Sequence, residues 1–393
     1  MTRPRPIVLL AAAGFALSLG VNMHVAMNVN FLHEILHATS WQQGYLESIR
    51  ETCGILSILV ITLLAGRSEP RVAAVMLAMT GAGLALYNRI GSIPVLILCS
   101  LTWSFGFHAF VPLTGSMQLA LAPRGREGRT IGIMGAVGAA GVLLGLACVY
   151  GFRVWAGMGM RDLFLLGGAV VMLGAIPLLF LPEVVAPRMT WHSIARFLQP
   201  RYRLYCGLEL MDGMRKQIFI LFATLAMVQE HGVKVETLAA LMFANQVLNL
   251  GLGPAAGHLV DRVGERPVLM AYFTGLVAVF LLYTLLHSLI ALYAVYMFDS
   301  ALWSLRVGVT TYAKRIARAG EQTRLLAMGV TMNHVGAVTL PLVGAALYSR
   351  YGYRLPFYCG AVIAAGSIFI AQALPVRVSV AERRTGPAAR PAH

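Results

Sequence analysis

The stretch G-H-L-V-D-R-V-G-E-R, residues 257–266, lies between two long apolar segments of the chain. Its glycines, Gly257 and Gly264, permit a close approach of helices and a tight turn. Asp261 lies between them, and two arginines follow it within five residues, so opposite charges are close together. The stretch therefore predicts a charged turn between two membrane helices, which can lock one arrangement of these helices and release in another.

The apolar segments beside this stretch are typical of the whole chain. Of its 393 residues 58% are hydrophobic and only 12% are charged, whereas a soluble domain carries about 25% charged residues. A bilayer core needs roughly 20 apolar residues per helix. Twelve such segments span residues 7–31, 43–66, 72–88, 94–120, 131–152, 163–182, 203–228, 237–260, 267–287, 289–313, 325–347 and 356–375. The composition excludes a soluble globular protein and predicts an all-α polytopic membrane protein.

One connection is longer than the others and divides the twelve segments into six plus six. It covers residues 183–202 and contains two prolines and three arginines. We therefore expect an N-terminal six-helix bundle at 1–182, a cytoplasmic linker at 183–202 and a C-terminal six-helix bundle at 203–376. Residues 377–393 are expected to form a disordered cytoplasmic tail.

The net charge of +15 is distributed according to membrane topology. With the N-terminus inside, 21 of the 31 Lys and Arg residues fall in inner connections and ends, six in outer connections and four within the segments. Cytoplasmic loops of membrane proteins carry such an excess of positive charge. The charge pattern therefore predicts that both termini are cytoplasmic, and it removes the main reason to expect a nucleic-acid partner.

The two halves also resemble each other in sequence. Arg67 and Arg71 follow the second apolar segment at the same spacing as the two arginines of 257–266, which lie 195 residues later. Residues 126–135 and 320–329 align at an offset of 194. A shared offset at two places indicates an internal repeat of about half the chain length.

Twelve apolar segments in a six-plus-six repeat, with both ends inside, resemble the major facilitator superfamily of secondary transporters. The stretch 257–266 is similar to the G-x-L-x-D-R-x-G-x-R motif of that superfamily, whereas its first-half counterpart has Gly66 in place of the aspartate and Glu69 in place of the second glycine. The resemblance implies two pseudo-symmetric six-helix bundles, and a transporter rather than an enzyme. The motif is occupied by Gly257, Leu259, Asp261, Arg262, Gly264 and Arg266, and all of these except the leucine are predicted to gate the conformational change.

Nine charged residues fall inside the predicted segments, where each costs about 2.5–3.5 kcal/mol to insert at the bilayer centre. They are Glu47, Arg50, Glu51, Glu209, Asp212, Arg215, Lys216, Asp299 and Arg306. The simpler explanation is that these charges pair with one another and fix helix packing. In the superfamily that the chain resembles, however, helices 1, 4, 7 and 10 line the central cavity. For the charges on the seventh and tenth segments we therefore favour a role in binding or coupling.

A single aspartate in the seventh segment cannot neutralise both Arg215 and Lys216, so a cation left over in the cavity would attract an anionic or zwitterionic ligand. The residues predicted to bind this ligand are Asn22, Asn28, His108, Arg215, Lys216, Arg306 and Tyr312. A carboxylate removed from water takes up a proton more readily. Glu51, Asp212 and Asp299 are therefore predicted to carry a coupling proton.

Residues 33–37, H-E-I-L-H, match the H-E-x-x-H signature of zinc metalloproteases. On a helix the two histidines would share a face and a zinc ion, but no third ligand is evident nearby, so an intramembrane zinc protease is the less favoured interpretation. Thioethers and imidazoles also suit soft metals such as Cu(I). Transport of a soft transition metal or its complex, with Met23, Met27, His33 and His37 as ligands, is a minority hypothesis, because methionines also simply fill gaps in apolar packing.

We therefore predict a secondary active transporter, integral to the bacterial inner membrane, that moves a small organic anion or zwitterion by alternating access. Its expected partners are this small-molecule substrate, protons as the coupling ion and the lipid bilayer. We expect no cofactor and no nucleic acid, and we expect a monomer. A drug/proton antiporter and a membrane scaffold without transport activity are the alternatives.

Overall fold

The computed structural model describes residues 6–64, 66–123, 126–185, 200–317 and 322–375. Within these ranges the regular structure is helical, apart from one isolated bridge between Ser68 and Val185. Most of the predicted linker at 183–202, and all of the predicted tail at 377–393, lie outside the described residues.

Each of the twelve predicted segments coincides with a helical run, and several runs contain a short irregular turn. In the first half of the chain the elements are α1 (Pro6–Asn30), η1 (Phe31–Ile35), α2 (Ser40–Leu64), α3 (Glu69–Ala85), η2 (Leu86–Arg89), α4 (Ile93–Leu121), α5 (Glu127–Val154), α6 (Met160–Leu173) and η3 (Ile176–Phe180). In the second half they are η5 (Pro200–Tyr202), α8 (Arg203–Gln217), η6 (Ile218–Ala223), α9 (Thr224–His231), α10 (Val235–Val263), α11 (Glu265–Leu285), α12 (Leu289–Trp303), η7 (Ser304–Arg306), α13 (Val307–Ile316), α14 (Gln322–Tyr351) and α15 (Arg354–Gln372).

The helices identify an integral membrane protein. Among the described residues, nine helical runs are long and apolar enough to cross a membrane. The three further runs of the twelve are α2, α8–η6–α9 and α12–η7–α13, and these carry all nine intramembrane charges. Two of them are also irregular, because η6 is a π-helical turn and η7 is a 3-10 turn. Irregular turns inside helices recur at functional sites, so charge and unusual geometry coincide on the same runs.

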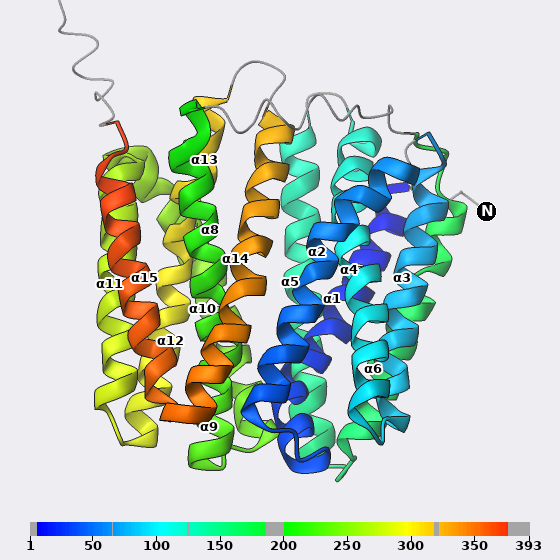
Figure 1. The fold of residues 1–393 in the computed structure, drawn as a ribbon. Coiled ribbons are helices and arrows are strands. Elements are labelled where there is room, and N and C mark those ends of the chain that lie inside the picture. Colours follow the sequence, from blue (N-terminus) through cyan, green and yellow to red (C-terminus); the bar gives the residue numbers. More distant parts are fainter. Residues whose placement is uncertain (1–5, 65, 124–125, 186–199, 318–321, 376–393) are drawn as a thin grey trace, which may run out of the picture.

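The helices form two groups that lie side by side (Figure 1). In the first group α1 packs against α5 and α6, and α3 packs against α4; in the second group α8 packs against α14 and α15, and α11 packs against α15. Each group has its own apolar core, with Trp103 and Phe164 in one and Phe222 and Phe280 in the other. We call these groups the first and second bundles. They meet where α2 packs against α14 and where α5 packs against α10.

The two faces at which the helices end are distinguishable. The start of α1, the end of α15 and the turn between α10 and α11 lie on one face, which we call the terminal face; the connection between α1 and α2 lies on the opposite face (Figure 1). On the opposite face the bundles are joined by hydrogen bonds. Asn30 Nδ2 donates to the Val233 carbonyl oxygen at 2.9 Å, and Ser40 Oγ donates to Gln229 Oε1 at 2.9 Å. These contacts close the opposite face between the bundles.

The charged turn between α10 and α11 has the predicted shape but not the predicted packing. Gly264 has φ +88°, in the left-handed region that favours glycine, so the prediction of a tight turn is confirmed. A Cβ at Gly257 would meet no described heavy atom within 4 Å, so the prediction of a close helix approach there is wrong for this arrangement. Glu265, which is 2% exposed, pairs with Arg315 at 3.4 Å and ties this turn to α13.

Close backbone contacts do occur where α14 packs against α8. A Cβ at Gly213 would lie 1.9 Å from the carbonyl oxygen of Asn333. We therefore expect Gly213→Ala to lower the free energy of unfolding by about 1–3 kcal/mol through overpacking. Gly251→Ala is the matched control, because a Cβ there meets no described atom within 4 Å, and alanine gains about 0.5–1 kcal/mol over glycine inside a helix. Thermal unfolding in detergent checks both, and equal stability of the two variants would contradict the described packing.

Candidate functional site

A central cavity of about 230 Å³ lies between the two bundles. It is lined by α1, α2, α4 and α5 from the first bundle, and by η6, α9, α10 and α12 from the second. Three kinds of side chain dominate its polar and aromatic surface. Carboxamides come from Asn22, Asn28, Asn245, Gln246 and Asn249, aromatic rings from Trp103, Phe219 and Tyr296, and charged groups from Glu47 and Arg50.

Two of the lining carboxamides contain an oxygen without a described hydrogen-bond partner. The Oδ1 atoms of Asn28 and Asn245 are buried without a hydrogen-bond partner among the described residues. They come from opposite bundles, on α1 and α10. A buried acceptor without a partner costs about 1–3 kcal/mol, and a solute that donates a hydrogen bond would recover this energy. Carboxamides of both bundles therefore line the cavity, and two of them have an acceptor that no described residue uses.

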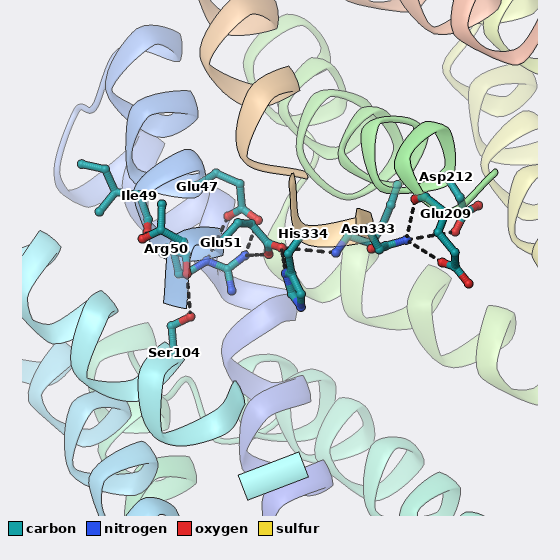
Figure 2. Close-up of polar contacts among 11 residues, drawn as sticks. Glu47, Ile49, Arg50, Glu51, Ser104, Glu209, Asp212, Asn333 and His334 are labelled. Atoms are coloured by element: carbon teal, nitrogen blue, oxygen red, sulfur yellow. Dashed lines mark hydrogen bonds and ion pairs between the residues drawn. The ribbon is translucent and has the colours of Figure 1, made fainter. Parts of the chain in front are cut away.

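The charged residues of the cavity already neutralise each other. Arg50 Nε donates to Glu47 Oε2 at 3.1 Å, and Arg50 Nη2 also contacts Glu47 Oε1. The guanidinium lies 4.9 Å from the centre of the Trp103 ring, a cation–π contact. Ser104 Oγ donates to the Arg50 carbonyl oxygen at 3.0 Å and fixes this turn of α2 against α4 (Figure 2). The pair offers the cavity a polar surface without a free unit charge.

A second set of charges lies within the second bundle. Arg215 contacts Asp299, and these side chains are 2% and 0% exposed. Arg306 Nε pairs with Asp212 Oδ2 at 2.5 Å, and its Nη2 pairs with Glu209 Oε2 at 2.7 Å. These contacts join α8 to α12 and η7. All of these charges are therefore paired with one another. This agrees with the simpler explanation of the sequence pattern, in which mutual pairing fixes the helices.

Asp212 has two further partners that complete its environment. The Tyr272 hydroxyl donates to Asp212 Oδ1 at 3.0 Å, and Asn333 Nδ2 donates to Asp212 Oδ2 at 3.3 Å. Figure 2 shows Asn333 pointing toward Asp212 and Glu209 while its neighbour His334 points toward Glu51. Two adjacent residues of α14 thus link the charges of one bundle to those of the other.

The leftover cation that suggested an anionic ligand is not found. Each of the four intramembrane cations has a carboxylate partner, because Lys216 Nζ pairs with Glu51 Oε2 at 3.3 Å. The nine charges comprise five carboxylates and four cations, so their formal sum is −1. The prediction counted partners only within the seventh segment, whereas the actual partners come from α2 and α12.

The structure separates the residues that were predicted to bind substrate. Asn22 and Asn28 line the central cavity. Arg215 and Lys216 line an adjoining pocket that shares Phe219, Ile220 and Ser300 with the central cavity. Arg306 lines a third pocket with Tyr205 and Thr310. His108 faces His334, with ring centres 4.6 Å apart. Tyr312 is buried near the terminal face, with Arg315 over its ring at 5.4 Å. Of the seven residues, two thus line the central cavity and two line the pocket beside it, whereas His108, Arg306 and Tyr312 lie elsewhere in this arrangement.

The H-E-x-x-H stretch does not lie on one α-helix. His33 belongs to the π-helical turn η1, and His37 lies beyond it with φ +49°. Glu34 Oε1 accepts a hydrogen bond from Asn30 Nδ2 at 2.7 Å. Met23 and Met27 are 1% and 0% exposed in the core of the first bundle, apart from the two histidines. Among the described residues, the side chains that come together with metal-ligand spacing are instead Glu51, His108 and His334.

Several cavity residues were not assigned to the site from the sequence. Asn245, Gln246 and Asn249 recur at helical spacing on an otherwise apolar segment, and that spacing predicts a shared polar face without locating it at the site. Trp103, Phe219 and Tyr296 carried no such signal, because aromatic residues in membrane helices mostly pack in the core. Their place at the cavity depends on which face of each helix the bundle interface exposes.

Comparison with known proteins agrees with this architecture. A sequence model of the Major Facilitator Superfamily matches residues 206–392, which include the charged turn at 257–266. The second half of the chain is therefore similar to the major facilitator superfamily. Along its length it is similar to the multidrug resistance protein MdtG of Enterobacter lignolyticus (strain SCF1), with 24% identity over 401 residues that cover 95% of this chain and 88% of the relative.

Solved structures of the superfamily share the fold. A mutant form of the nucleoside transporter NupG superposes with a TM-score of 0.80 at 13% identity, and 94% of this chain and 99% of that chain are covered. A D-xylose-proton symporter superposes with a TM-score of 0.73 at 16% identity, covering 94% and 98% of the two chains. The likeness to these structures shows that the chain has the same all-α fold.

Proposed function

We propose that this protein is a transporter of the major facilitator superfamily, and not an enzyme, and that it carries an uncharged, polar organic solute across the bacterial inner membrane by alternating access, with its termini in the cytoplasm and protons as the driving ion. One observation supports the proposal: carboxamides of both bundles line the central cavity, while its charged residues are paired with each other. On this proposal the opposite face is the outer face, and the contacts at Asn30 and Ser40 close it. The predicted bundle boundaries at 1–182 and 203–376 are kept as part of the proposal.

The chemistry of the cavity favours a neutral solute with a flat face. Carboxamides both donate and accept hydrogen bonds, as hydroxyl and amino groups of a polar solute require. The rings of Trp103, Phe219 and Tyr296 offer apolar faces against which a sugar ring or a heterocycle can pack. A cavity of about 230 Å³ is smaller than the 300–1,000 Å³ typical of drug-sized sites. A compact solute is therefore expected.

The charge balance disfavours the organic anion predicted from the sequence. An anion would need a cation in the cavity, but Arg50 is occupied by Glu47 and stacked on Trp103. The intramembrane charges also sum to −1, which repels a second negative charge. A zwitterion would meet the same obstacle at its anionic end.

A second candidate solute is an aromatic organic cation. The negative charge sum and the Trp103 ring would both favour a cation, and the similar chain MdtG is a multidrug resistance protein. Competition separates the two candidates. An uncharged nucleoside or pentose displaced by other neutral solutes supports the first, whereas displacement only by aromatic cations supports the second.

Asn245 provides a direct test of the carboxamide site. Because its Oδ1 is buried without a described partner, Asn245→Ala should not lower the free energy of unfolding, while it removes a hydrogen-bonding group from the cavity lining. We expect the solute Kd to rise about tenfold, measured on purified protein with hits from a thermal-shift panel of nucleosides, sugars, organic anions and organic cations. Gln42→Ala is the matched carboxamide control outside the cavity. Stabilisation by anions alone would contradict the proposal.

A further inference from the structure

Glu51 differs from the other predicted proton carriers in what it faces. Asp299 contacts Arg215, and Asp212 contacts Arg306. A guanidinium keeps its charge at any physiological pH, so a proton on Asp299 would leave the buried Arg215 without a partner, whereas Asp212 shares Arg306 with Glu209. Glu51 instead lies 3.0 Å from Nδ1 of His334, and an imidazole, unlike a guanidinium, can be either neutral or charged. The contact between Glu51 and His334 is therefore suited to reversible binding of a proton.

The groups around Glu51 come from both bundles. On its own helix α2, Arg50 Nη2 lies 3.5 Å from Glu51 Oε1, and Arg50 is itself bound to Glu47. From α8, Lys216 Nζ lies 3.3 Å from Oε2. From α14 comes His334 (Figure 2).

Two more titratable groups lie close by. From α4 comes His108, whose Nε2 is buried and has no partner among the described residues. The Cys53 thiol on α2 donates to the Leu101 carbonyl oxygen at 3.8 Å. Two imidazoles with ring centres 4.6 Å apart repel each other when both are charged, so the cluster is suited to one added proton.

The close packing of α2 against α14 brings the His334 ring next to Glu51. A Cβ at Gly54 of α2 would lie 2.5 Å from atoms of the His334 ring, so only glycine lets the ring lie directly against α2. Nearby, Ser48 Oγ donates to the Val338 carbonyl oxygen at 2.6 Å. A Cβ at Gly44 would lie 2.6 Å from the Pro341 carbonyl oxygen. The α2–α14 interface is thus tight from the cluster to the opposite face, and it must separate if that face opens.

The charge sum gives the cluster a reason to take up a proton. Glu47, Arg50, Glu51 and Lys216 cancel, and the remaining charges of the second bundle, without Lys216, leave one carboxylate in excess. A proton on His334 would bring the intramembrane total from −1 to zero. It would also add an attraction to Glu51 across the two bundles. The excess carboxylate lies near His334, because the adjacent Asn333 donates hydrogen bonds to Glu209 and Asp212.

We propose that Glu51 and His334 form the binding site of the coupling proton, and that the proton bound there holds α2 against α14 and so keeps the opposite face closed. This inference rests on the proposed function as a proton-driven transporter. The same three side chains, Glu51, His108 and His334, have metal-ligand spacing. A divalent cation would, however, meet the fixed charges of Lys216 and Arg50 within 3.5 Å of the same carboxylate, which favours the proton.

The first test measures conformation without any solute. Spin labels on Gln42→Cys and Ser349→Cys, in full-length protein whose five native cysteines are replaced, report the separation of α2 and α14 on the opposite face. We expect the closed fraction to rise as the pH falls from about 8 to about 5. This dependence should disappear in Glu51→Gln and in His334→Gln, and it should persist in His258→Gln, an exposed histidine of α10. An unchanged dependence in His334→Gln would overturn the proposal.

The second test separates coupling from transport. In proteoliposomes, Glu51→Gln and His334→Gln should lose about tenfold in proton-driven accumulation while solute exchange at equal pH stays near that of the unsubstituted protein. Equal loss of both would overturn the coupling role. If the unsubstituted protein moves no neutral solute yet shows the pH-dependent closure, the proposed function fails and the proton site stands. Stoichiometric zinc binding that is lost in His108→Gln would make the cluster a metal site and overturn it.

Discussion

Arg215→Leu should lower the free energy of unfolding in detergent by about 3–5 kcal/mol, because it leaves Asp299 buried without its cation. Arg215 and Asp299 are 2% and 0% exposed and contact each other directly. The Arg215 guanidinium also lies 4.9 Å from the centre of the Trp303 ring. Loss of the arginine therefore removes an ion pair and a cation–π contact from one place.

The double variant Arg215→Leu with Asp299→Leu distinguishes a structural pair from a substrate site. Removing both charges leaves no unpaired group, and stability should return to within about 1–2 kcal/mol of the unsubstituted protein. Arg350→Leu, at an exposed position of α14, controls for the loss of an arginine. Chemical denaturation followed by intrinsic fluorescence gives the values. A stable Arg215→Leu protein that fails to bind solute would instead restore Arg215 to the binding role predicted from the sequence.

The architecture could be predicted from the sequence because it depends on the hydropathy of contiguous segments and on the charge of the loops between them. Runs of about 20 apolar residues, the asymmetry of Lys and Arg between loops and the stretch at 257–266 each point to two six-helix bundles. The irregular turns η6 and η7 could not be predicted, because single π and 3-10 turns depend on packing against neighbouring helices.

The nine intramembrane charges were also found from the sequence, but their partners were not. Arg215 and Asp299 are 84 residues apart, and Lys216 and Glu51 are 165 residues apart. Helical spacing relates residues three and four positions apart, so it offered Asp212 as the partner of Arg215. In the folded protein Arg215 instead pairs with Asp299 of α12, and Lys216 pairs with Glu51 of α2, so neither cation of this segment is left over. The predicted anionic ligand depended on a leftover cation.

A disulfide between cysteines introduced as Ser40→Cys and Gln229→Cys should abolish transport. In the described arrangement Ser40 Oγ and Gln229 Oε1 are 2.9 Å apart and belong to different bundles. Alternating access requires these bundles to part on the opposite face, and a covalent link there prevents it. In a background without the five native cysteines, uptake by proteoliposomes should fall to that of protein-free vesicles after oxidation and return after reduction.

A link within one bundle is the control that makes this result specific. Asn88 and Arg161 are held together inside the first bundle, where Arg161 Nη1 donates to the Asn88 carbonyl oxygen at 2.8 Å and Asn88 Nδ2 donates to the Arg161 carbonyl oxygen at 3.1 Å. Cysteines at these two positions should be oxidised with little effect on uptake, because a rigid bundle need not deform. Solute binding from the terminal face should survive the Ser40–Gln229 link, since the central cavity is unchanged. Uptake that persists through this link would mean that the solute does not pass between the bundles, and alternating access about the central cavity would have to be abandoned.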